Sequence, residues 1–356
     1  MLIVGTVVGI VLLIVLIVVW VVRRSDGRYR FRPSFEAACE VTVGGRRLVA
    51  YSGHRKVIRL ADPATREDTA VLTHSRTWIR ALCEVHVDGR PLLASGGRDG
   101  VVRLWDLEDR GELVASLTGH RGWVYGLCTV RISGRDLLAS AGRDGVIHVW
   151  DPRDGRLVRT IDTGPRKGWI FSLCQVRTGG RTLLAAGHGN GTVTLWHAKS
   201  GQAALELTAH NRAVWTLCEV SDGDRTLLAT AGWDGVVRLW DVEAPQEVRA
   251  FTAGVGPVYA LCQAEAGDHT LLVAGGDGPG TAVWDPFTGE RAGDLGMDLA
   301  GLLSGHGWVR AACQVRPAQG PPLVITVGYD DGARVWDVVK EIGSAPSERG
   351  APEERA

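Results

Sequence analysis

The chain has 356 residues, and its 40 lysines and arginines balance its 40 aspartates and glutamates. A formal charge of zero provides no global field to attract nucleic acid or an anionic membrane surface, so bulk electrostatic binding is disfavoured. The 47 glycines and the scarcity of aromatic residues other than the 13 tryptophans indicate many short strands and turns. The seven cysteines are odd in number, so they cannot all pair within the chain.

Residues 1–22 form an apolar segment without a charged side chain. As a helix rising about 1.5 Å per residue, this segment is roughly 30 Å long, the thickness of a bilayer core. Five arginines follow between Arg23 and Arg32, and Trp20 lies where an interfacial aromatic is expected. Because the basic cluster is on the C-terminal side, the sequence predicts a single-pass membrane anchor with the N-terminus outside and the rest of the chain in the cytosol.

A cleaved secretory signal is the alternative interpretation of the same segment. Such a signal has a basic n-region, a shorter apolar run and a cleavage site of small residues. Here the residues before the apolar run carry no side-chain charge, and Val21, Val22 and Arg23 do not form a cleavage site. The sequence therefore favours the uncleaved anchor over an exported protein.

After this segment, one pattern recurs seven times, which makes internal repetition the main structural signal. Copies such as LLASGGRDGVVRLWD and LLASAGRDGVIHVWD return with a period of 44 to 52 residues. Each repeat has four short β-rich runs separated by Gly and Asp turns. A four-stranded sheet cannot cover its own apolar faces, so seven equal sheets stacked radially give a closed ring. The copies lie at 48–62, 92–106, 137–151, 183–197, 227–241, 271–285 and 323–337.

The cysteines keep the same period, one per repeat in a short apolar run. Equivalent positions in successive repeats are too far apart to form disulfides, and buried free thiols fit the pattern better than disulfides or metal ligands. Free thiols also agree with a cytosolic location. The seven are Cys39, Cys83, Cys128, Cys174, Cys218, Cys262 and Cys313.

Five repeats end in Trp-Asp, at 105–106, 150–151, 240–241, 284–285 and 336–337, and Gly-His stands at 119–120 and 305–306. These motifs resemble the WD-repeat family, which includes the G-protein β subunit, over roughly residues 28–340. The resemblance implies an all-β fold, a seven-bladed WD-repeat β-propeller, preceded here by a single N-terminal transmembrane helix.

Four segments follow from this interpretation. Residues 1–22 are the transmembrane anchor, 23–34 a basic juxtamembrane linker, 35–342 the propeller and 343–356 a tail whose composition predicts disorder. In the resembling family an N-terminal strand often completes the last blade, and by analogy residues 28–32 are the candidate for that strand.

The resemblance also implies a buried hydrogen-bond network of His, Ser or Thr, Asp and Trp in each blade. Repetition argues against a catalytic triad, because an enzyme needs one site whereas every blade needs bracing. Ala61, Ala186 and Ala274 break the pattern in the first, fourth and sixth blades, so the network is not carried over to those blades. The complete sets are His74, Ser95, Asp99 and Trp105; His120, Ser140, Asp144 and Trp150; His210, Thr230, Asp234 and Trp240; and His306, Thr326, Asp330 and Trp336.

A second group of residues lies where the innermost strand of each blade begins, which in the resembling family is the entrance to the central channel. Three residues before the cysteines stand Glu36, Arg80, Tyr125, Phe171, Trp215, Tyr259 and Arg310. Five residues before stand Trp78, Trp123, Trp169 and Trp308. The residues before the turn aspartates are Arg98, Arg143, Trp233 and Tyr329. This composition is that of a binding hot spot, and aromatic rings also attract cations; wedging of the tryptophans between blades is the alternative.

Motifs for phosphate binding, paired metal-binding cysteines and a nucleophilic serine lack a supporting context, so no cofactor, metal or catalytic residue is predicted. The arginines are spread over the blades, which does not favour nucleic acid as a partner. The sequence thus predicts a non-enzymatic, membrane-tethered scaffold that binds a protein or peptide at the channel entrance. An exported propeller and a propeller enzyme acting at the channel are the alternatives, and the sequence does not identify the partner.

Overall fold

The chain divides into two compact units, Met1–Arg32 and Pro33–Ala356. The predicted anchor, linker and tail, with the candidate closing strand at 28–32, lie outside the described residues. Within the described ranges, the structure contains no helix with both the length and the hydropathy needed to cross a membrane. The computed structural model describes residues 35–53, 57–73, 77–109, 111–223, 225–278, 280–295, 309–317, 320–328 and 333–342.

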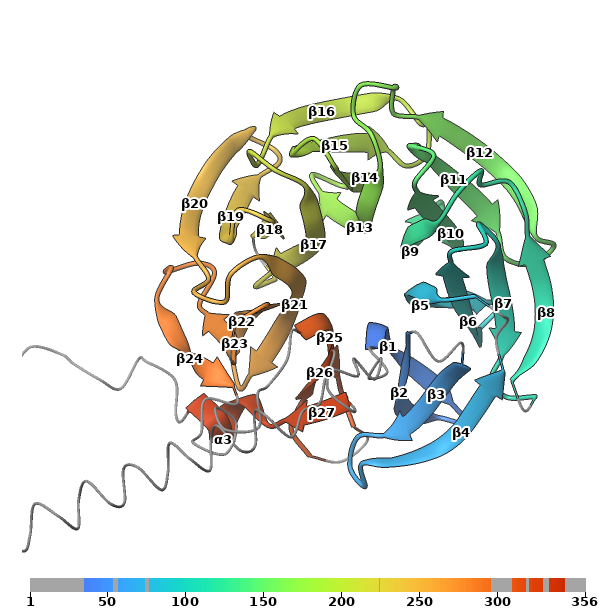
Figure 1. The fold of residues 1–356 in the computed structure, drawn as a ribbon, viewed down its shortest axis with the longest axis horizontal. Helices are drawn as coiled ribbons and strands as arrows, with labels where there is room; N and C mark the ends of the chain where they lie inside the picture. Colours follow the sequence, from blue (N-terminus) through green and yellow to red (C-terminus); the bar gives the residue numbers. More distant parts are fainter. Residues whose placement is uncertain are drawn as a thin grey trace, which may run out of the picture. The chain divides into compact units, whose positions relative to one another are not determined.

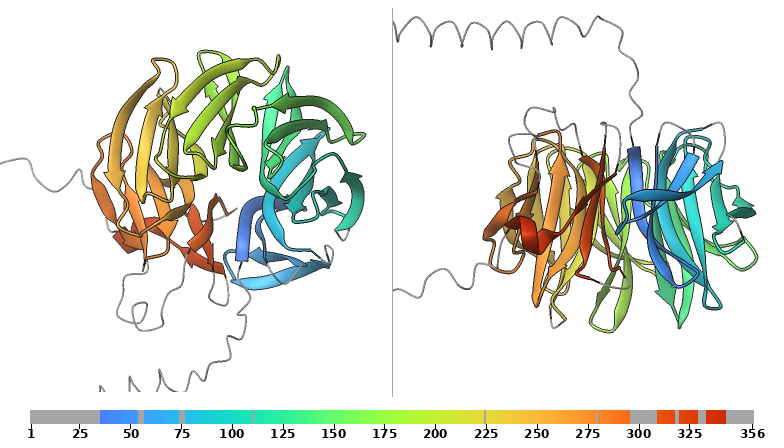
Figure 2. Two further views of the ribbon diagram at one scale, coloured as in Figure 1. Left: turned by 45° about the horizontal axis from the view of Figure 1, so that its top comes forward. Right: turned by 90° about the horizontal axis from the view of Figure 1, so that it is seen from below.

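The second unit is a ring of seven antiparallel sheets around a central opening, which confirms the predicted seven-bladed β-propeller (Figure 1). Within each sheet the strands pair in chain order, and the first strand lies nearest the opening. The strands run between the two faces of the disc, as the edge-on view in Figure 2 shows.

The strand bounds of the first four blades follow the predicted repeat. The first contains β1 (Phe35–Val43), β2 (Arg46–Gly53), β3 (Val57–Asp62) and β4 (Glu67–Thr73). The second contains β5 (Ile79–Val87), β6 (Arg90–Gly97), β7 (Val102–Asp106) and β8 (Glu112–Leu117). The third contains β9 (Val124–Ile132), β10 (Arg135–Gly142), β11 (Val146–Asp151) and β12 (Arg156–Asp162). The fourth contains β13 (Ile170–Thr178), β14 (Arg181–His188), β15 (Thr192–His197) and β16 (Ala203–Thr208).

The remaining blades have the same order, with a shorter set of described strands in the last. The fifth contains β17 (Val214–Ser221), β18 (Thr226–Gly232), β19 (Val236–Asp241) and β20 (Gln246–Thr252). The sixth contains β21 (Val258–Ala266), β22 (His269–Gly276), β23 (Thr281–Trp284) and β24 (Arg291–Leu295). The seventh contains β25 (Val309–Val315), β26 (Leu323–Gly328) and β27 (Ala333–Trp336). After β27 the chain forms a short helix, α3 (Val338–Ile342), where the sequence offered too few residues for a fourth strand.

The apolar core lies between neighbouring blades rather than within one blade. The second strand of a blade is covered on both faces, so β6 is buried along almost its whole length, whereas the outermost β8 is mostly exposed. One cluster joins Leu104 of the second blade to Leu127 of the third. Another joins Tyr51 of the first blade to Ile325 of the seventh and so contributes to ring closure. Burial of this apolar area is the main force that holds the sheets together.

Polar bonds also join successive blades at one repeated position. In five blades the side chain directly after the cysteine accepts a hydrogen bond from a backbone N–H of the preceding blade, and in the third blade Thr129 instead donates to the carbonyl oxygen of Glu84. These bonds were not predicted, although Glu or Gln stands at this position in most repeats. The last pair closes the ring, since Glu40 lies on β1 and Arg316 directly follows β25. The acceptor and donor pairs are Glu84 with Thr42, Gln175 with Arg131, Glu219 with Arg177, Gln263 with Ser221 and Glu40 with Arg316.

Candidate functional site

Every innermost strand begins with a β-bulge, and the bulged residue is the one three positions before the cysteine. On β5, for example, Ile79 and Ala81 pair with successive residues of β6, and Arg80 is left between them. A bulge inserts one unpaired residue, bends the strand and re-aims a side chain. The same irregularity occurs in all seven blades, so we call these residues the entrance ring: Glu36, Arg80, Tyr125, Phe171, Trp215, Tyr259 and Arg310.

Four consecutive blades contribute a continuous aromatic arc to the entrance ring. The ring centroids of Tyr125 and Phe171 are 5.1 Å apart, those of Phe171 and Trp215 are 4.2 Å apart, and those of Trp215 and Tyr259 are 5.7 Å apart. The guanidinium carbon of Arg310 lies 3.9 Å from the Tyr259 ring centroid, at a cation–π distance. The arc therefore runs through the third to sixth blades and ends in a cation on the seventh.

The opposite part of the entrance ring carries an ion pair. Nη1 of Arg80 lies 2.7 Å from Oε2 of Glu36, and the Glu36 side chain is only 7% exposed. The pair explains how a carboxylate can be buried at this position, because burial of a charge is costly without a partner. Glu36 was the one carboxylate that the sequence placed at the entrance, and here it is engaged with Arg80.

A second layer of alternating tryptophan and arginine side chains adjoins the ring in the second, third and fourth blades. In these blades two predicted entrance positions are joined by a backbone hydrogen bond. Arg98 donates its backbone N–H to the carbonyl oxygen of Trp78 at 3.1 Å, and Arg143 donates to that of Trp123 at 2.8 Å. The side chains then stack across blade boundaries. We call this row the Trp–Arg ladder, which consists of Trp78, Arg98, Trp123, Arg143 and Trp169.

Each arginine of the ladder lies between two indole rings. The guanidinium carbon of Arg98 is 4.3 Å from the Trp78 centroid and 3.9 Å from the Trp123 centroid. That of Arg143 is 5.9 Å from the Trp123 centroid and 4.9 Å from the Trp169 centroid. Trp78 and Trp123 are partly buried, whereas Trp169 is 42% exposed. The tryptophans thus combine packing against a neighbour with access to solvent.

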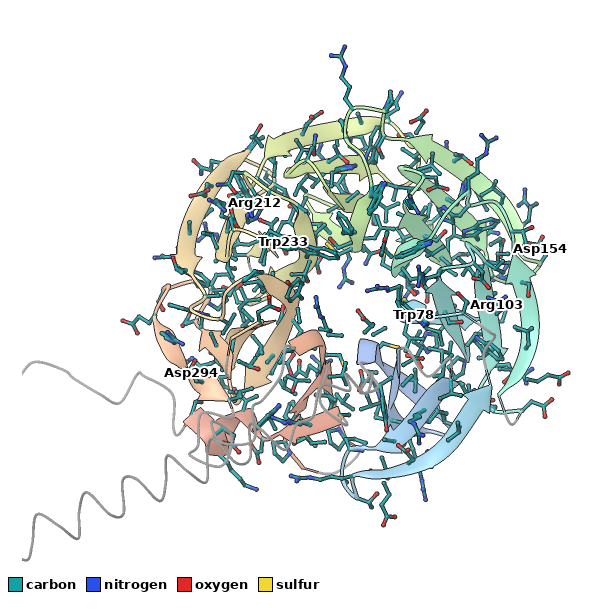
Figure 3. The ribbon with its side chains drawn as sticks, in the orientation of Figure 1. Trp78, Arg103, Asp154, Arg212, Trp233 and Asp294 are labelled. Atoms are coloured by element: carbon teal, nitrogen blue, oxygen red, sulfur yellow. The ribbon has the colours of Figure 1, made fainter. Side chains whose placement is uncertain are left out.

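The other predicted entrance residues divide into described and undescribed positions. Trp233 is 43% exposed and, like Trp78, lies toward the central opening, whereas Asp154 and Asp294 lie at the outer circumference (Figure 3). Trp308 and Tyr329 fall outside the described residues.

The electrostatics of the entrance reflect burial next to a group of arginines. Burial raises the pKa of the Tyr125 hydroxyl, and the positive charges of Arg80, Arg143 and Arg98 oppose that rise. Burial likewise raises the pKa of Tyr259, and Arg310 opposes it. The Tyr259 hydroxyl lies 3.1 Å from Oδ2 of Asp277 and donates to it. Both phenols are therefore neutral at physiological pH.

The buried network of the third blade contains the four predicted residues. Nδ1 of His120 lies 2.9 Å from Oδ2 of Asp144, and Nε2 lies 2.7 Å from Oγ of Ser140. Trp150 donates its indole N–H to the same Oγ at 2.8 Å. Since a carboxylate can only accept, Nδ1 is the donor to Asp144. Burial raises the pKa of Asp144, but the hydrogen bond and charge of His120 and the backbone N–H groups of Arg121 and Val146 together outweigh it, so the pKa lies below the ordinary value.

The fifth blade repeats this arrangement and adds a cation. His210 bonds Asp234 at 3.0 Å and Thr230 at 2.8 Å, and Trp240 donates to Thr230 at 3.0 Å. Arg238 forms a 2.9 Å ion pair with Asp234. Burial lowers the pKa of His210, although Asp234 acts in the opposite direction.

In the described parts of the second and seventh blades, the network is represented by the bond from the tryptophan to the hydroxyl group. Trp105 donates to Ser95 at 2.8 Å, and Trp336 donates to Thr326 at 2.8 Å. Asp99 forms a 2.7 Å ion pair with Arg103. His74, His306 and Asp330 lie outside the described residues.

The fourth blade, for which no network was predicted, has a different one. Trp196 donates its indole N–H to Oγ1 of Thr194 at 2.9 Å, and Nε2 of His188 lies 2.8 Å from the same oxygen. Burial lowers the pKa of His188 to about 4, with Lys167 as a second cause, so the imidazole is neutral at pH 7. Thr194 thus replaces the hydroxyl lost at Ala186 from the neighbouring strand β15.

One cluster of the described chain has the residue types of a metal site. One ligand atom each from His120, Asp144 and His148 lies within 4.8 Å of the other two. Both nitrogens of His120 already bond Asp144 and Ser140, and Nδ1 of His148 lies 3.0 Å from Oγ1 of Thr160. Metal coordination by His120 would have to break the blade's network, so the geometry favours bracing.

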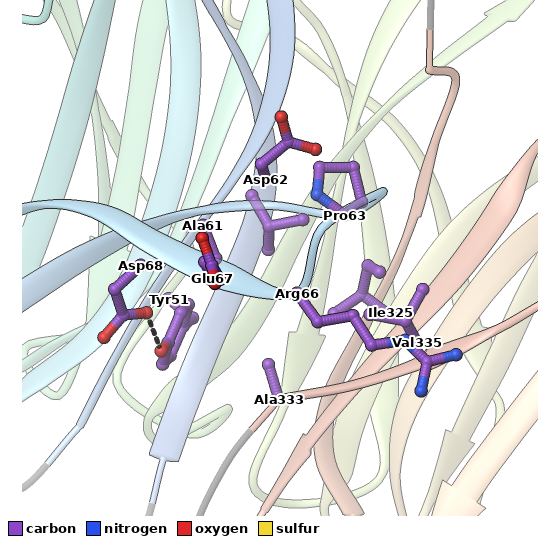
Figure 4. Close-up of a pocket in the computed structure, with 11 residues that line it drawn as sticks. Tyr51, Ala61, Asp62, Pro63, Arg66, Glu67, Asp68, Ile325, Ala333 and Val335 are labelled. Atoms are coloured by element: carbon purple, nitrogen blue, oxygen red, sulfur yellow. Dashed lines mark hydrogen bonds between the residues drawn. The ribbon is translucent and has the colours of Figure 1, made fainter. Parts of the chain in front are cut away.

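A cavity of about 390 Å³ lies at the seam between the seventh and first blades (Figure 4). Its wall includes Ile325 and Val335 of the seventh blade and Arg66 of the first. Tyr51 also lines it and donates a 2.5 Å hydrogen bond to Asp68. None of the predicted entrance residues is among its described lining, so this cavity is separate from the entrance ring.

The second unit is a ring of seven antiparallel sheets, and tryptophans of its Trp-Asp motifs donate hydrogen bonds to Ser or Thr. These two features define a WD-repeat β-propeller. The model of the WDR54 family matches residues 84–267, just over half of the chain, and the chain belongs to this family. The matched region includes most of the Trp–Arg ladder and the whole aromatic arc. No curated protein sequence matches the chain.

Proposed function

We propose that this protein is a non-catalytic scaffold that captures a protein or peptide partner at the entrance ring. The observation that carries the proposal is the unbroken row from Tyr125 to Tyr259, capped by Arg310. Stacked aromatic rings and arginine are the side chains that dominate binding energy in protein interfaces. WD-repeat propellers generally act as interaction scaffolds, which supports the same class of function.

The position of these residues supports binding over a purely structural role. A bulged residue is excluded from the regular ladder of backbone pairs, so the fold does not require a particular side chain there. The chemistry accordingly changes from blade to blade, from Glu36 through Arg80 to Trp215. A partner that places an apolar or cationic group on the aromatic arc and an acidic group beside Arg310 matches this surface.

Two observations favour a scaffold over a propeller enzyme. Glu36, the candidate acid at the channel, is paired with Arg80 at 2.7 Å and is almost completely buried. The His–Asp pairs are locked in the blade networks, where each histidine nitrogen already has a partner. Proton transfer to a substrate requires a group within hydrogen-bond reach of it, and the His–Asp pairs are buried.

We further propose that residues 1–22 tether the propeller to a membrane, with the N-terminus outside and the propeller in the cytosol. The support is the uncharged apolar run and the five arginines that follow it. Protease added to intact cells should spare the propeller, and the intact mass of the mature protein should equal that of the full chain. Rapid digestion would reverse the orientation, and loss of the first segment would favour the exported alternative.

The binding proposal is tested by partner capture from detergent-solubilised membranes with Trp215→Ala and Arg310→Ala. Truncation of a hot-spot residue costs about 2 kcal/mol or more, which corresponds to roughly thirtyfold weaker binding. Arg156→Ala is the matched control, because its side chain is 68% exposed on the outermost strand β12. Unchanged capture by folded Trp215→Ala and Arg310→Ala variants would contradict the entrance-ring site.

A further inference from the structure

Trp123 is surrounded by three guanidinium groups. Their carbons lie 3.9 Å (Arg98), 5.9 Å (Arg143) and 5.9 Å (Arg80) from its ring centroid. All three arginines also act on the Tyr125 hydroxyl, which places their charges close to the same side chain. Like charges around one indole repel one another unless each is paired with an acid, so an anion bound beside the unpaired ones would relieve an electrostatic cost.

Only one of these three charges has an acidic partner in the described chain. Arg80 pairs with Glu36 at 2.7 Å. The aspartates that follow the other two in sequence pair elsewhere, Asp99 with Arg103 and Asp144 with His120. Within the described ranges, no carboxylate forms an ion pair with Arg98 or Arg143, and these two retain two uncompensated positive charges.

The stacking decides which part of each guanidinium group is available. The guanidinium group of Arg98 contacts the indole rings of both Trp78 and Trp123. Its N–H edge is therefore the part left for a ligand. A guanidinium edge matches a carboxylate through two parallel hydrogen bonds. The indole rings are already in contact with guanidinium groups, which disfavours stacking of a nucleobase on them and so favours an acidic peptide over a nucleic acid.

The upper limit on the spacing of the two arginines is compatible with an extended peptide. Both lie beside the same indole, so their separation cannot exceed the sum of 3.9 Å and 5.9 Å. Alternate side chains on one face of an extended strand are roughly 6.6 Å apart. The ladder ends at the fourth blade, where Gly189 occupies the position of Arg98 and Arg143 and makes the same backbone bond to Trp169 at 2.9 Å without a side chain.

We propose that the Trp–Arg ladder recognises an extended acidic peptide segment, with carboxylates at alternate positions bound by Arg98 and Arg143. This inference rests on the proposed partner capture and names the chemistry of the partner. The aromatic arc then contacts the flanking residues of the same peptide.

The test is fluorescence anisotropy of the full-length chain with a short labelled peptide of alternating glutamate and serine. Arg98→Gln and Arg143→Gln should each weaken binding about tenfold, since each removes a charge-assisted bidentate contact. Arg156→Gln removes the same charge from an exposed side chain of β12 and should bind as the unchanged protein does. Binding should also weaken at about 1 M salt, where the screening length falls to ~3 Å.

Three results would overturn the inference. The first is equal binding of a peptide with glutamine in place of glutamate. The second is a loss of binding in Arg156→Gln as large as in the ladder variants. The third is tighter binding of a single-stranded oligodeoxythymidine than of the peptide. Arg143 is exposed, so Arg143→Gln remains informative if Arg98→Gln fails to fold. If the acidic peptide fails to bind while Trp215→Ala still loses its cellular partner, the ladder inference is wrong and the proposed function stands. If neither effect occurs, both are wrong.

Discussion

The entrance ring and the buried His networks both consist of positions that recur once per blade, but they differ in what is repeated. In the third and fifth blades the networks keep the same chemistry, with His120 and His210 bonded to a hydroxyl and a carboxylate. The entrance ring keeps the same backbone geometry, a bulge in every blade, while its side chains change. A repeated position with constant chemistry stabilises the fold, whereas one with constant geometry and varied chemistry is available for recognition.

The fourth blade sharpens this comparison. It lacks the usual hydroxyl, because Ala186 stands there, and yet Trp196 still donates to a hydroxyl, that of Thr194. A buried indole N–H without an acceptor costs about 1–3 kcal/mol, so the blade replaces the acceptor from another strand. The fourth blade therefore keeps the chemistry of the brace, whereas in the sixth blade the buried indole N–H of Trp284 has no acceptor among the described residues.

The largest expected effect is on stability, from His210→Ala. The substitution removes two buried hydrogen bonds, one to Thr230 and one to Asp234, which then keep only Trp240 and Arg238 as side-chain partners. We expect a loss of about 3 kcal/mol in the free energy of unfolding. Denaturant titration measures it. His86→Ala, whose side chain is 42% exposed on β5, is the control and should change stability by no more than about 0.5 kcal/mol. An equal effect of the two substitutions would remove the distinction between braces and surface positions.

The second effect is on binding, from a graded pair at the entrance ring. Trp215→Phe keeps an aromatic ring between Phe171 and Tyr259 and should weaken partner binding less than the roughly thirtyfold loss expected for Trp215→Ala. Both variants should unfold at a higher denaturant concentration than His210→Ala. Anisotropy measures the binding and denaturant titration measures the stability of the same samples. A stability loss in Trp215→Ala as large as in His210→Ala would contradict this expectation.

The third effect is a loss of stability in mild acid. The pKa of His188 is about 4 in the folded chain and near 6.5 in an unfolded one. The folded state therefore favours the neutral imidazole, and its advantage is complete above pH 6.5 and decreases as the pH falls toward 4. At pH 5 the loss is about 2 kcal/mol. His188→Gln should flatten this pH dependence in denaturant titrations, whereas an unchanged slope would show that His188 is not its source.

The smallest expected effect concerns the cysteines, a third recurring position that belongs to neither group. All seven are free, and burial raises the pKa of Cys83 to about 11 and that of Cys218 to about 12. Because the thiolate is the reactive form, native thiols should react slowly with an aromatic disulfide reagent at pH 7.5 and completely after denaturation. Rapid reaction of the native protein would show that the innermost strands are open to solvent.

Much of the architecture could be predicted because each of the seven copies of the repeat supports the same structural interpretation. The Trp-Asp endings and the period of the cysteines predicted seven blades, and the position three before each cysteine was correctly placed on the innermost strands. The β-bulge that re-aims those residues was not predicted, since a bulge depends on the pairing of two strands and has no composition of its own. The Thr194 acceptor of the fourth blade was missed for a similar reason, because β14 and β15 had to be aligned before His188 and Trp196 could be seen to share the Thr194 hydroxyl.

The sequence by itself determined the propeller, because local turns, short strands and the need to cover both faces of each sheet all require radial stacking. It is also the sole basis for the proposed membrane anchor at residues 1–22. Only the tertiary structure decided which side chains meet across blade boundaries. Arg98 and Trp123 belong to different repeats, and their 3.9 Å contact depends on how one sheet is rotated against the next. That rotation results from packing of the whole ring, so the Trp–Arg ladder appears only when the blades are assembled.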